Sequence, residues 1–422
     1  MAKLRYGQSV SEILMDDDDL YLHLTEDITM TDVYMLSATR SAIGSFGGSL
    51  KDISPIDLGI AITSSAIERS GLAAEDIGHA VIGNVIHTEP RDMYISRCIS
   101  IGAGMPEASP ALTVNRLCGS GLQAIASATQ LIKLGDTDTA VAGGVEVMSR
   151  SGHILPAHRW GERMGDSSVH DMMLGALHDP FGHGHMGITA ENVAADEGIS
   201  RDDQDAFALE SQRRAAAARD AGYFTDQITP VEVMKRRKPV SFEVDEYIRD
   251  DADMDSLSSL RPVFQKDGSV TAGNSSGIND GAAAVVLASG DAVKHHGATP
   301  IARIVAYGFG GVAPRIMGMG PVPASAMALE RAGLKASDLA VVESNEAFAA
   351  QACAVTRQLG LDPEIVNPNG GAIALGHPVG ATGAVIMTKL VHECIRRGGR
   401  YGMATMCIGG GQGISIIIDT TL

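Results

Sequence analysis

Short apolar runs alternate with stretches of helical periodicity in the first third of the chain. Four apolar runs predict strands, and they cover residues 33–37, 80–84, 111–114 and 139–144. Two intervening stretches predict helices, and they cover residues 96–102 and 122–134. Because a strand, a helix and a second strand in this order form a right-handed crossover, we expect parallel pairing between neighbouring strands.

The alternation stops between about Arg150 and Asn274. This section contains histidines, prolines and charges without a strand rhythm. Its one long periodic stretch predicts a helix over 201–221, entered through Ser200. We therefore expect an inserted, loop-rich subdomain at 150–276.

The second half of the chain repeats the order of the first. Apolar runs return at 282–288 and 301–307. The segment 364–370, the glycine-rich run after it and a helical stretch at 384–396 then correspond to the unit around residue 118, and 400–410 corresponds to 139–144. The pattern predicts duplicated halves and four parts of the chain: an extension at 1–29, a first half formed by 30–149 with 277–299, the insertion at 150–276, and a second half at 300–422.

Composition and charge narrow the function classes. The 422 residues include 49 glycines, which suits the tight turns of an α/β protein, and the net charge of −18 argues against a nucleic-acid-binding surface. The basic run Lys235 to Lys238 is interpreted as a solvated loop. No apolar stretch approaches the ~20 residues of a spanning helix, and Asp16 to Asp19 do not fit a basic transit peptide. We expect a cytoplasmic protein that binds neither nucleic acid nor membrane.

Five cysteines show no paired spacing, so neither a disulfide framework nor a metal site is expected. Cys118 stands directly before Gly119, Cys407 is separated only by Ile408 from the glycines at 409–411, and His377 lies between Gly376 and Pro378. A cysteine at a strand-to-helix junction becomes a nucleophile beside a helix N-terminus and an imidazole. A second cysteine in a glycine-rich turn can approach the same point and move protons.

At these residues the chain resembles the thiolase family, within it the β-ketothiolase and acetyl-CoA acetyltransferase group. The resemblance runs from about residue 33 to the C-terminus and rests on separated motifs in the same order. They are Asn-Arg-Leu-Cys-Gly-Ser-Gly at 115–121, His-Met-Gly at 185–187, Asn-Ser-Ser-Gly at 274–277, Asn-Glu-Ala-Phe at 345–348, Gly-His-Pro at 376–378 and Cys-Ile-Gly-Gly-Gly at 407–411.

The resemblance implies the fold and the chemistry. The fold is α/β, with two similar halves whose mixed sheets stand in an αβαβα layered arrangement, plus the inserted loop subdomain. The reaction is reversible Claisen condensation of acetyl-CoA with an acyl-CoA, or thiolysis of a 3-oxoacyl-CoA. By resemblance, Cys118 is the nucleophile, His377 its deprotonating partner and Cys407 the base. The His377 ring and a water held by Asn345 stabilise the enolate, and the N–H groups of Cys118 and Gly409 face the acyl-enzyme oxygen.

The resemblance also implies a coenzyme A site in the insertion and near it. The matching positions are Leu177, His185, Met186, Arg249, Ser256, Phe264, Ala272, Ser276, Ile278, Ala347 and Phe348. Arg249 is expected to pair with the nucleotide. Ser275 and Ser344 stand where many relatives carry alanine. Acyl-CoA enters as a substrate, no permanently bound cofactor is expected, and the family implies a homo-oligomer, a dimer of dimers.

Two other function classes remain open at this point. A decarboxylating enzyme of the ketoacyl synthase type would use one cysteine with two histidines or a His/Asn pair, whereas here Asn345 and Cys407 favour non-decarboxylating chemistry. A non-catalytic acyl-CoA-binding protein would need the pocket without Cys407. The other cysteines, Cys98, Cys353 and Cys394, are interpreted as small apolar side chains.

Overall fold

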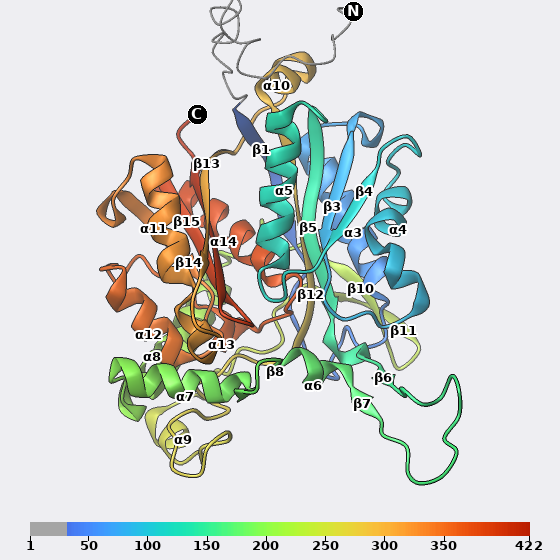
Figure 1. Ribbon diagram of the computed structural model, residues 1–422. Coiled ribbons are helices and arrows are strands. Elements are labelled where there is room, and N and C mark those ends of the chain that lie inside the picture. The colour runs from blue at the N-terminus through green and yellow to red at the C-terminus, as the bar shows by residue number, and fades with distance from the viewer. Residues whose placement is uncertain (1–31) are drawn as a thin grey trace, which may run out of the picture. The chain divides into compact units, whose positions relative to one another are not determined.

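The computed structural model describes residues 32–422, so the extension predicted at 1–29 lies outside the described residues. Ten strands form one sheet (Figure 1). In chain order they are β1 (Val33–Arg40), β2 (Gly44–Ser45), β3 (His79–Gly83), β4 (Ala111–Val114), β5 (Thr139–Val147), β12 (Asn279–Ser289), β13 (Ala302–Gly311), β14 (Leu339–Ser344), β15 (Tyr401–Ile408) and β16 (Gln412–Asp419).

The two halves have the same strand order. Outward from the centre the first half runs β1-β12-β5-β3-β4, and the second runs β13-β16-β15-β14. Next to β14, an isolated parallel bridge between Val342 and Val366 occupies the position in the second half that β4 occupies in the first. In both halves the outer pairs are parallel and the inner pairs antiparallel. The sheet is thus mixed, as expected.

The half-sheets are joined at the centre. Val33, Tyr34 and Met35 of β1 pair with β13 on one side in an antiparallel ladder, and on the other side β1 pairs with β12 from Val33 to Arg40. The expected two sheets are therefore one continuous ladder that bends around the helices between its halves. The boundaries given above for the four parts of the chain stay a prediction.

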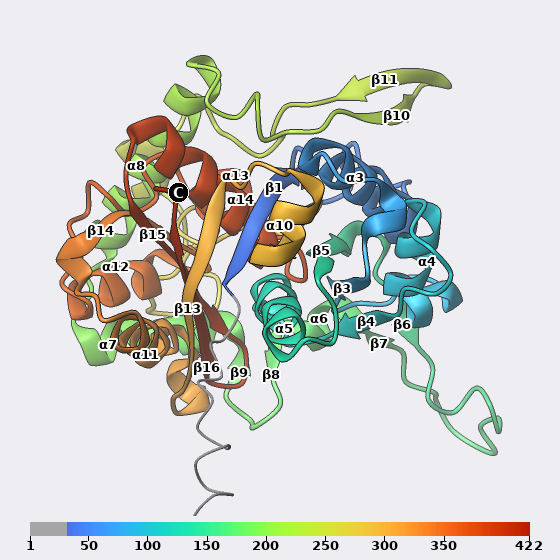
Figure 2. The same cartoon turned by 90° about the horizontal axis from the view of Figure 1, so that it is seen from above.

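Helices complete the layers. α5 (Ser120–Leu134) and α14 (Thr382–Arg397) pack against each other and against strands of both halves. α3 (Pro55–Ser70) and α4 (Ile95–Gly102) cover the outer face of the first half, and α11 (Pro321–Ala332) covers that of the second (Figure 2). This order of layers is the expected αβαβα arrangement.

Two glycines allow α5 and α14 to approach closely. A Cβ atom on Gly121 would lie 2.5 Å from the backbone nitrogen of Ala384, and one on Gly383 would lie 2.2 Å from that of Leu122. Real Cβ atoms do not tolerate such contacts, so larger residues would force the helices apart. The N-termini of these two helices carry the loops of Cys118 and His377, and their packing therefore fixes how those loops face each other.

The insertion contains more regular structure than expected. The predicted helix at 201–221 is α8 (Arg201–Asp220), and Ser200 caps it through the N–H of Asp203. Its other elements are β6 (His153–Ile154), β7 (His170–Asp171), α6 (Met172–Ala176), β8 (His178–Asp179), β9 (Gly184–His185), α7 (Met186–Glu197), β10 (Val231–Lys235), β11 (Lys238–Phe242) and α9 (Met254–Ser258).

Two local predictions need correction. The basic run at 235–238 is exposed to solvent, as predicted, but only its two arginines form a turn, with φ of 52° and 66°, and Lys235 pairs with Lys238 in the β10–β11 hairpin. The segment 364–370 makes one bridge instead of a strand, because Pro363 and Pro368 lack N–H donors and Asn367 turns the chain with a φ of 45°.

The remaining helices lie in the second half and before β13. They are α10 (Gly290–His296), α12 (Ala349–Gln358) and α13 (Ala372–Leu375). Within residues 32–422 no helix combines the length and the apolarity needed to cross a bilayer.

Candidate active site

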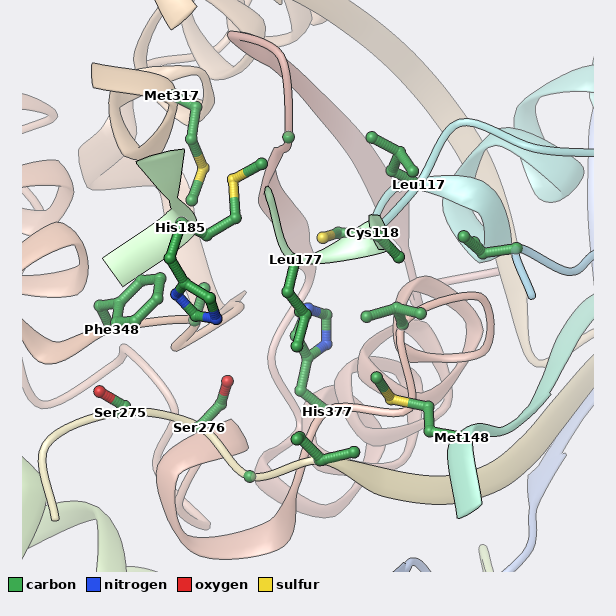
Figure 3. A pocket seen from close by; sticks show the side chains of 18 of the residues that line it. Leu117, Cys118, Met148, Leu177, His185, Ser275, Ser276, Met317, Phe348 and His377 are labelled. Atoms are coloured by element: carbon green, nitrogen blue, oxygen red, sulfur yellow. The ribbon is translucent and has the colours of Figure 1, made fainter. Parts of the chain in front are cut away.

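A cavity of about 360 Å³ lies where the insertion meets the two glycine-rich loops (Figure 3). Cys118, His377 and Gly409 all line it, although they come from the loop before α5, the loop before α14 and the turn after β15. The structure therefore brings together residues that are far apart in the sequence, at the point where the two halves face each other.

A strained turn presents Cys118 to this cavity. Leu117 has a φ of 45°, in the left-handed region that non-glycine residues rarely adopt. Its N–H donates to Oδ1 of Asn115 at 2.9 Å, and its carbonyl accepts from the Ser120 hydroxyl at 2.7 Å. α5 begins at Ser120, so Cys118 stands at the positive end of a helix dipole. Strain of about 1–3 kcal/mol at such a residue persists only where surrounding contacts hold it.

The surroundings of Cys118 act on its thiol in both directions. Burial raises its pKa, and this effect dominates. The backbone N–H groups of Gly409 and of Cys118 itself act against it, because they donate toward the sulfur and favour the thiolate. A thiol with a raised pKa needs a neighbouring base before it can attack a thioester.

His377 is in the neutral state that a side chain needs in order to accept a proton from a thiol. The side chain is 6% exposed, and burial lowers its pKa to about 4, so the ring is neutral near pH 7. Its backbone N–H donates to Oδ1 of Asn279 at 2.9 Å. Gly376 has a φ of 111°, and a Cβ atom there would lie 2.4 Å from the amide carbon of Asn279. Glycine at this position lets the chain pass Asn279 and turn the histidine into the cavity.

Cys407 and Asn345 lie beside the cavity and do not line it. Cys407 is fully buried at the end of β15 and packs with Met186, Met317 and Phe348, which do form the cavity wall. Burial and then the negative charge of a Cys118 thiolate raise the pKa of Cys407. Asn345 is 1% exposed, and neither atom of its amide has a hydrogen-bond partner among residues 32–422.

Most of the predicted coenzyme A residues line the same cavity. They are Leu177, His185, Met186, Phe264, Ala272, Ser276, Ile278, Ala347 and Phe348. The rings of His185 and Phe264 stack with centroids 4.7 Å apart, and apolar side chains dominate this part of the wall. A narrow apolar cavity suits an extended chain such as pantetheine.

The two other predicted residues are placed outside the cavity. Arg249 is exposed, and its guanidinium lies 5.3 Å from the ring centre of Tyr247, a residue of the cavity wall. It therefore stands close to the entrance. Ser256 is also exposed and helps to cap α9 through Asp253. Tyr247 was missed from the sequence, and its only signal is an aromatic residue two positions before Arg249.

A buried carboxylate was missed as well. Glu146 of β5 is 0% exposed and accepts four N–H donors, from the side chain of Asn84 and the backbones of Val85, Ile86 and Gly380. Burial raises its pKa to about 8. The Glu146 side chain ties the loop after His377 to the first half. A single acidic residue in an otherwise apolar strand is the one sequence signal for it.

Comparison with known protein families identifies the family of this chain. The thiolase N-terminal domain matches residues 33–291, and the thiolase C-terminal domain matches residues 298–420. This chain belongs to the thiolase family. Thiolases are acyltransferases that work on substrates linked to coenzyme A, and a structure with this ligand is among the neighbours described next.

Individual thiolases resemble it over nearly their whole length. The β-ketothiolase BktB of Cupriavidus necator is 59% identical over 389 residues, which are 92% of this chain and 99% of that protein. The acetyl-CoA acetyltransferase of Escherichia coli is 48% identical over 92% of this chain and 99% of that protein. The crystal structure of human mitochondrial 3-ketoacyl-CoA thiolase in complex with CoA has a TM-score of 0.91 at 44% identity, covering 93% of this chain and 99% of that one. The predicted family and fold are confirmed.

Proposed function

We propose that this thiolase catalyses the reversible Claisen condensation of acetyl-CoA with an acyl-CoA, and the reverse thiolysis of a 3-oxoacyl-CoA, through an acyl group on Cys118. The observation that carries the proposal is the shared cavity: the Cys118 thiol, a neutral His377 ring and the Gly409 turn line one space with an apolar tunnel. That set fits thioester exchange on a long, mostly apolar substrate.

The first half-reaction moves the acyl group to the enzyme. His377 takes the Cys118 proton, the sulfur attacks the thioester carbonyl, and the bond to the CoA sulfur breaks. The developing oxyanion lies near the N–H groups of Cys118 and Gly409, which already donate toward the sulfur. Cys407 must lose its own proton before it can act as a base, and the departing CoA thiolate accepts that proton.

The second half-reaction forms the carbon–carbon bond. Cys407 removes an α-proton from acetyl-CoA, and the resulting enolate is stabilised by His377 and by a water held on the Asn345 amide. The carbanion attacks the carbonyl on Cys118, whose sulfur leaves and takes its proton back from His377. A cysteine whose pKa is raised, as it is for Cys407, is a strong base once ionised.

The remaining expectations belong to the same proposal. The enzyme works in the cytoplasm without a permanently bound cofactor, as a dimer of dimers. Exposed apolar groups support an assembly: Trp160 is 89% and Met164 90% exposed on the projecting loop between β6 and β7 (Figure 1), and Leu112 is 43% exposed on the edge strand β4. Large exposed apolar side chains on such elements are typical of protein interfaces.

Purified protein tests the function in one experiment. We expect thiolysis of acetoacetyl-CoA, no decarboxylation of malonyl-CoA, and a gain of one acetyl mass when the protein is mixed with acetyl-CoA. Cys118→Ala removes the thiolysis and the mass gain, and Cys353→Ala serves as the matched control that keeps both. Decarboxylation of malonyl-CoA would favour a synthase, and binding of acetyl-CoA without either reaction would favour a non-catalytic protein. An acetyl group on Cys407 would overturn the assignment of Cys118.

A further inference from the structure

Only one of the two ring nitrogens of His377 has a hydrogen-bond partner among residues 32–422. Nε2 is buried without a partner, and the ring lines the cavity together with Cys118. Nδ1 lies 2.7 Å from Oγ1 of Thr382, the first residue of α14. Thr382 is 2% exposed, so solvent does not compete for this contact.

The Thr382 hydroxyl has one proton and two neighbours. Oγ1 lies 2.9 Å from the carbonyl oxygen of Pro378, four residues earlier, in the bond that threonine commonly makes inside a helix. A carbonyl oxygen only accepts, so the hydroxyl proton goes to Pro378. The other arrangement would direct that proton at Nδ1 and leave two lone pairs facing each other at this distance. The hydroxyl therefore has only an acceptor site left for the ring.

This constraint determines which ring nitrogen carries the proton in neutral His377. Nδ1 must donate to Oγ1, so Nε2 is left with a bare lone pair. The low pKa of His377 agrees with a neutral partner, because a carboxylate in the place of Thr382 would stabilise the charged ring. The same Nδ1–H bond persists when Nε2 takes a proton, so the ring does not have to turn during the reaction.

We propose that Thr382 is a positioning residue that fixes His377 in the tautomer with the proton on Nδ1, and so keeps Nε2 ready to accept the Cys118 proton. The inference rests on the function proposed above. Thr382 acts through His377 and touches neither the thiol nor the substrate tunnel, since it does not line that cavity.

Two substitutions separate the hydroxyl from the shape of the side chain. Thr382→Val keeps the volume and removes the hydroxyl, whereas Thr382→Ser keeps the hydroxyl and removes a methyl group. We expect single-turnover acetylation of Cys118 by acetyl-CoA, followed by intact mass, to slow by ~10²–10⁴-fold in Thr382→Val, which is the range for losing a positioned base. Thr382→Ser should stay within about threefold of the parent, since its oxygen can make both bonds.

Solid-state NMR of protein labelled with ¹⁵N-histidine reads the tautomer directly. The His377 signals are identified by their absence from His377→Asn, and they should show a protonated Nδ1 and a bare Nε2 in the parent and in Thr382→Ser. A proton on Nε2 in the parent would overturn the proposal. So would acetylation of Thr382→Val at the parental rate, or a serine variant as slow as the valine variant.

The spectrum of the parent tests the proposed tautomer of His377 even if Thr382→Val fails to fold. It also distinguishes a failure of this inference from a failure of the proposed function. A parent that carries the expected tautomer but is not acetylated by acetyl-CoA would refute the acyl-enzyme reaction and leave the role of Thr382 in place.

Discussion

Lys389 and Glu343 form an ion pair inside the molecule, between α14 and β14. Nζ lies 2.6 Å from Oε2, and the two side chains are 2% and 1% exposed. Nζ also donates to the carbonyl of Gly370 at 2.6 Å. Burial raises the pKa of Glu343 to about 7, and the Lys389 charge opposes that rise. Lys389→Met has a similar length and removes the group that keeps the pKa of Glu343 from rising further.

The loss in free energy of unfolding depends on which state of the buried Glu343 carboxyl costs less once Lys389 is removed. It can stay charged without a partner, at about 3–5 kcal/mol, or take up a proton. Below its folded pKa of about 7 the parent already holds a proton on Glu343, so the variant loses stability relative to the parent only above that pH. The loss is about 1.4 kcal/mol per pH unit, which gives about 1.4 kcal/mol at pH 8 and about 2.7 kcal/mol at pH 9. The lost bond to Gly370 adds about 1 kcal/mol. We expect Lys389→Met to lower the free energy of unfolding by about 1 kcal/mol at pH 6, about 2.4 kcal/mol at pH 8 and about 3.7 kcal/mol at pH 9.

The sign follows from proton binding. Above pH 7 the folded variant holds a proton that both the folded parent and the unfolded chain have released, so the loss relative to the parent grows as pH rises through the folded pKa of about 7. Urea unfolding followed by circular dichroism at pH 6, 8 and 9 measures it. The double variant Lys389→Met/Glu343→Leu buries no charge and should recover most of the loss without pH dependence. An equal loss at pH 6 and pH 9, or a double variant no more stable than the single one, would refute this reasoning.

Three further outcomes are expected. Cys407→Ser should still be acetylated at Cys118, while α-proton exchange and turnover fall by ~10²–10⁴-fold; an equal loss of acetylation would make Cys407 part of nucleophile activation. Gly383→Ala places a Cβ atom 2.2 Å from the backbone of α5, and the overpacking of about 1–3 kcal/mol should lower the melting temperature. Gly175→Ala, whose added Cβ atom would have nothing within 4 Å, should leave the melting temperature unchanged. Equal melting temperatures for the two variants would contradict the close packing of α5 and α14. Arg249→Ala should raise KM for CoA about twofold to fivefold in thiolysis with kcat unchanged, as expected for an exposed charge; a loss in kcat alone would place it in the chemistry.

The turns that present the reactive groups were predictable because their signals are local. Glycines next to Cys118 and His377, and two residues after Cys407, mark places where the backbone adopts unusual angles or approaches closely, and such marks are readable in a single sequence. Their roles in the reaction stay predictions. The burial of Cys407 behind Met186 was not readable, because it depends on how the insertion packs against β15.

The supports of the site could not be predicted from the pattern alone. Glu146 meets Gly380, and Lys389 meets Glu343, across separations in sequence that only the completed sheet closes. In the sequence alone, these charged residues cannot be told from the charged residues that lie on the surface. The strand β14 was missed as well, and β16 was missed for a different reason. The segment Gln412–Asp419, which forms β16, has a clear apolar pattern, but it directly follows the glycine-rich turn and was not separated from it.

The place of the Gly409 turn in the chain has a consequence for biosynthesis. This turn joins β15 to β16, which pair with each other inside the sheet, and β16 fills the gap beside β13. The N–H group that faces the Cys118 sulfur is thus synthesised long after the thiol itself. Until then the thiol at position 118 lacks one of its two backbone donors, and β13 lacks β16 as its neighbour. We therefore expect a nascent chain to carry an ordinary cysteine that consumes no acyl-CoA, and to become reactive only when the Gly409 turn and β16 are in place.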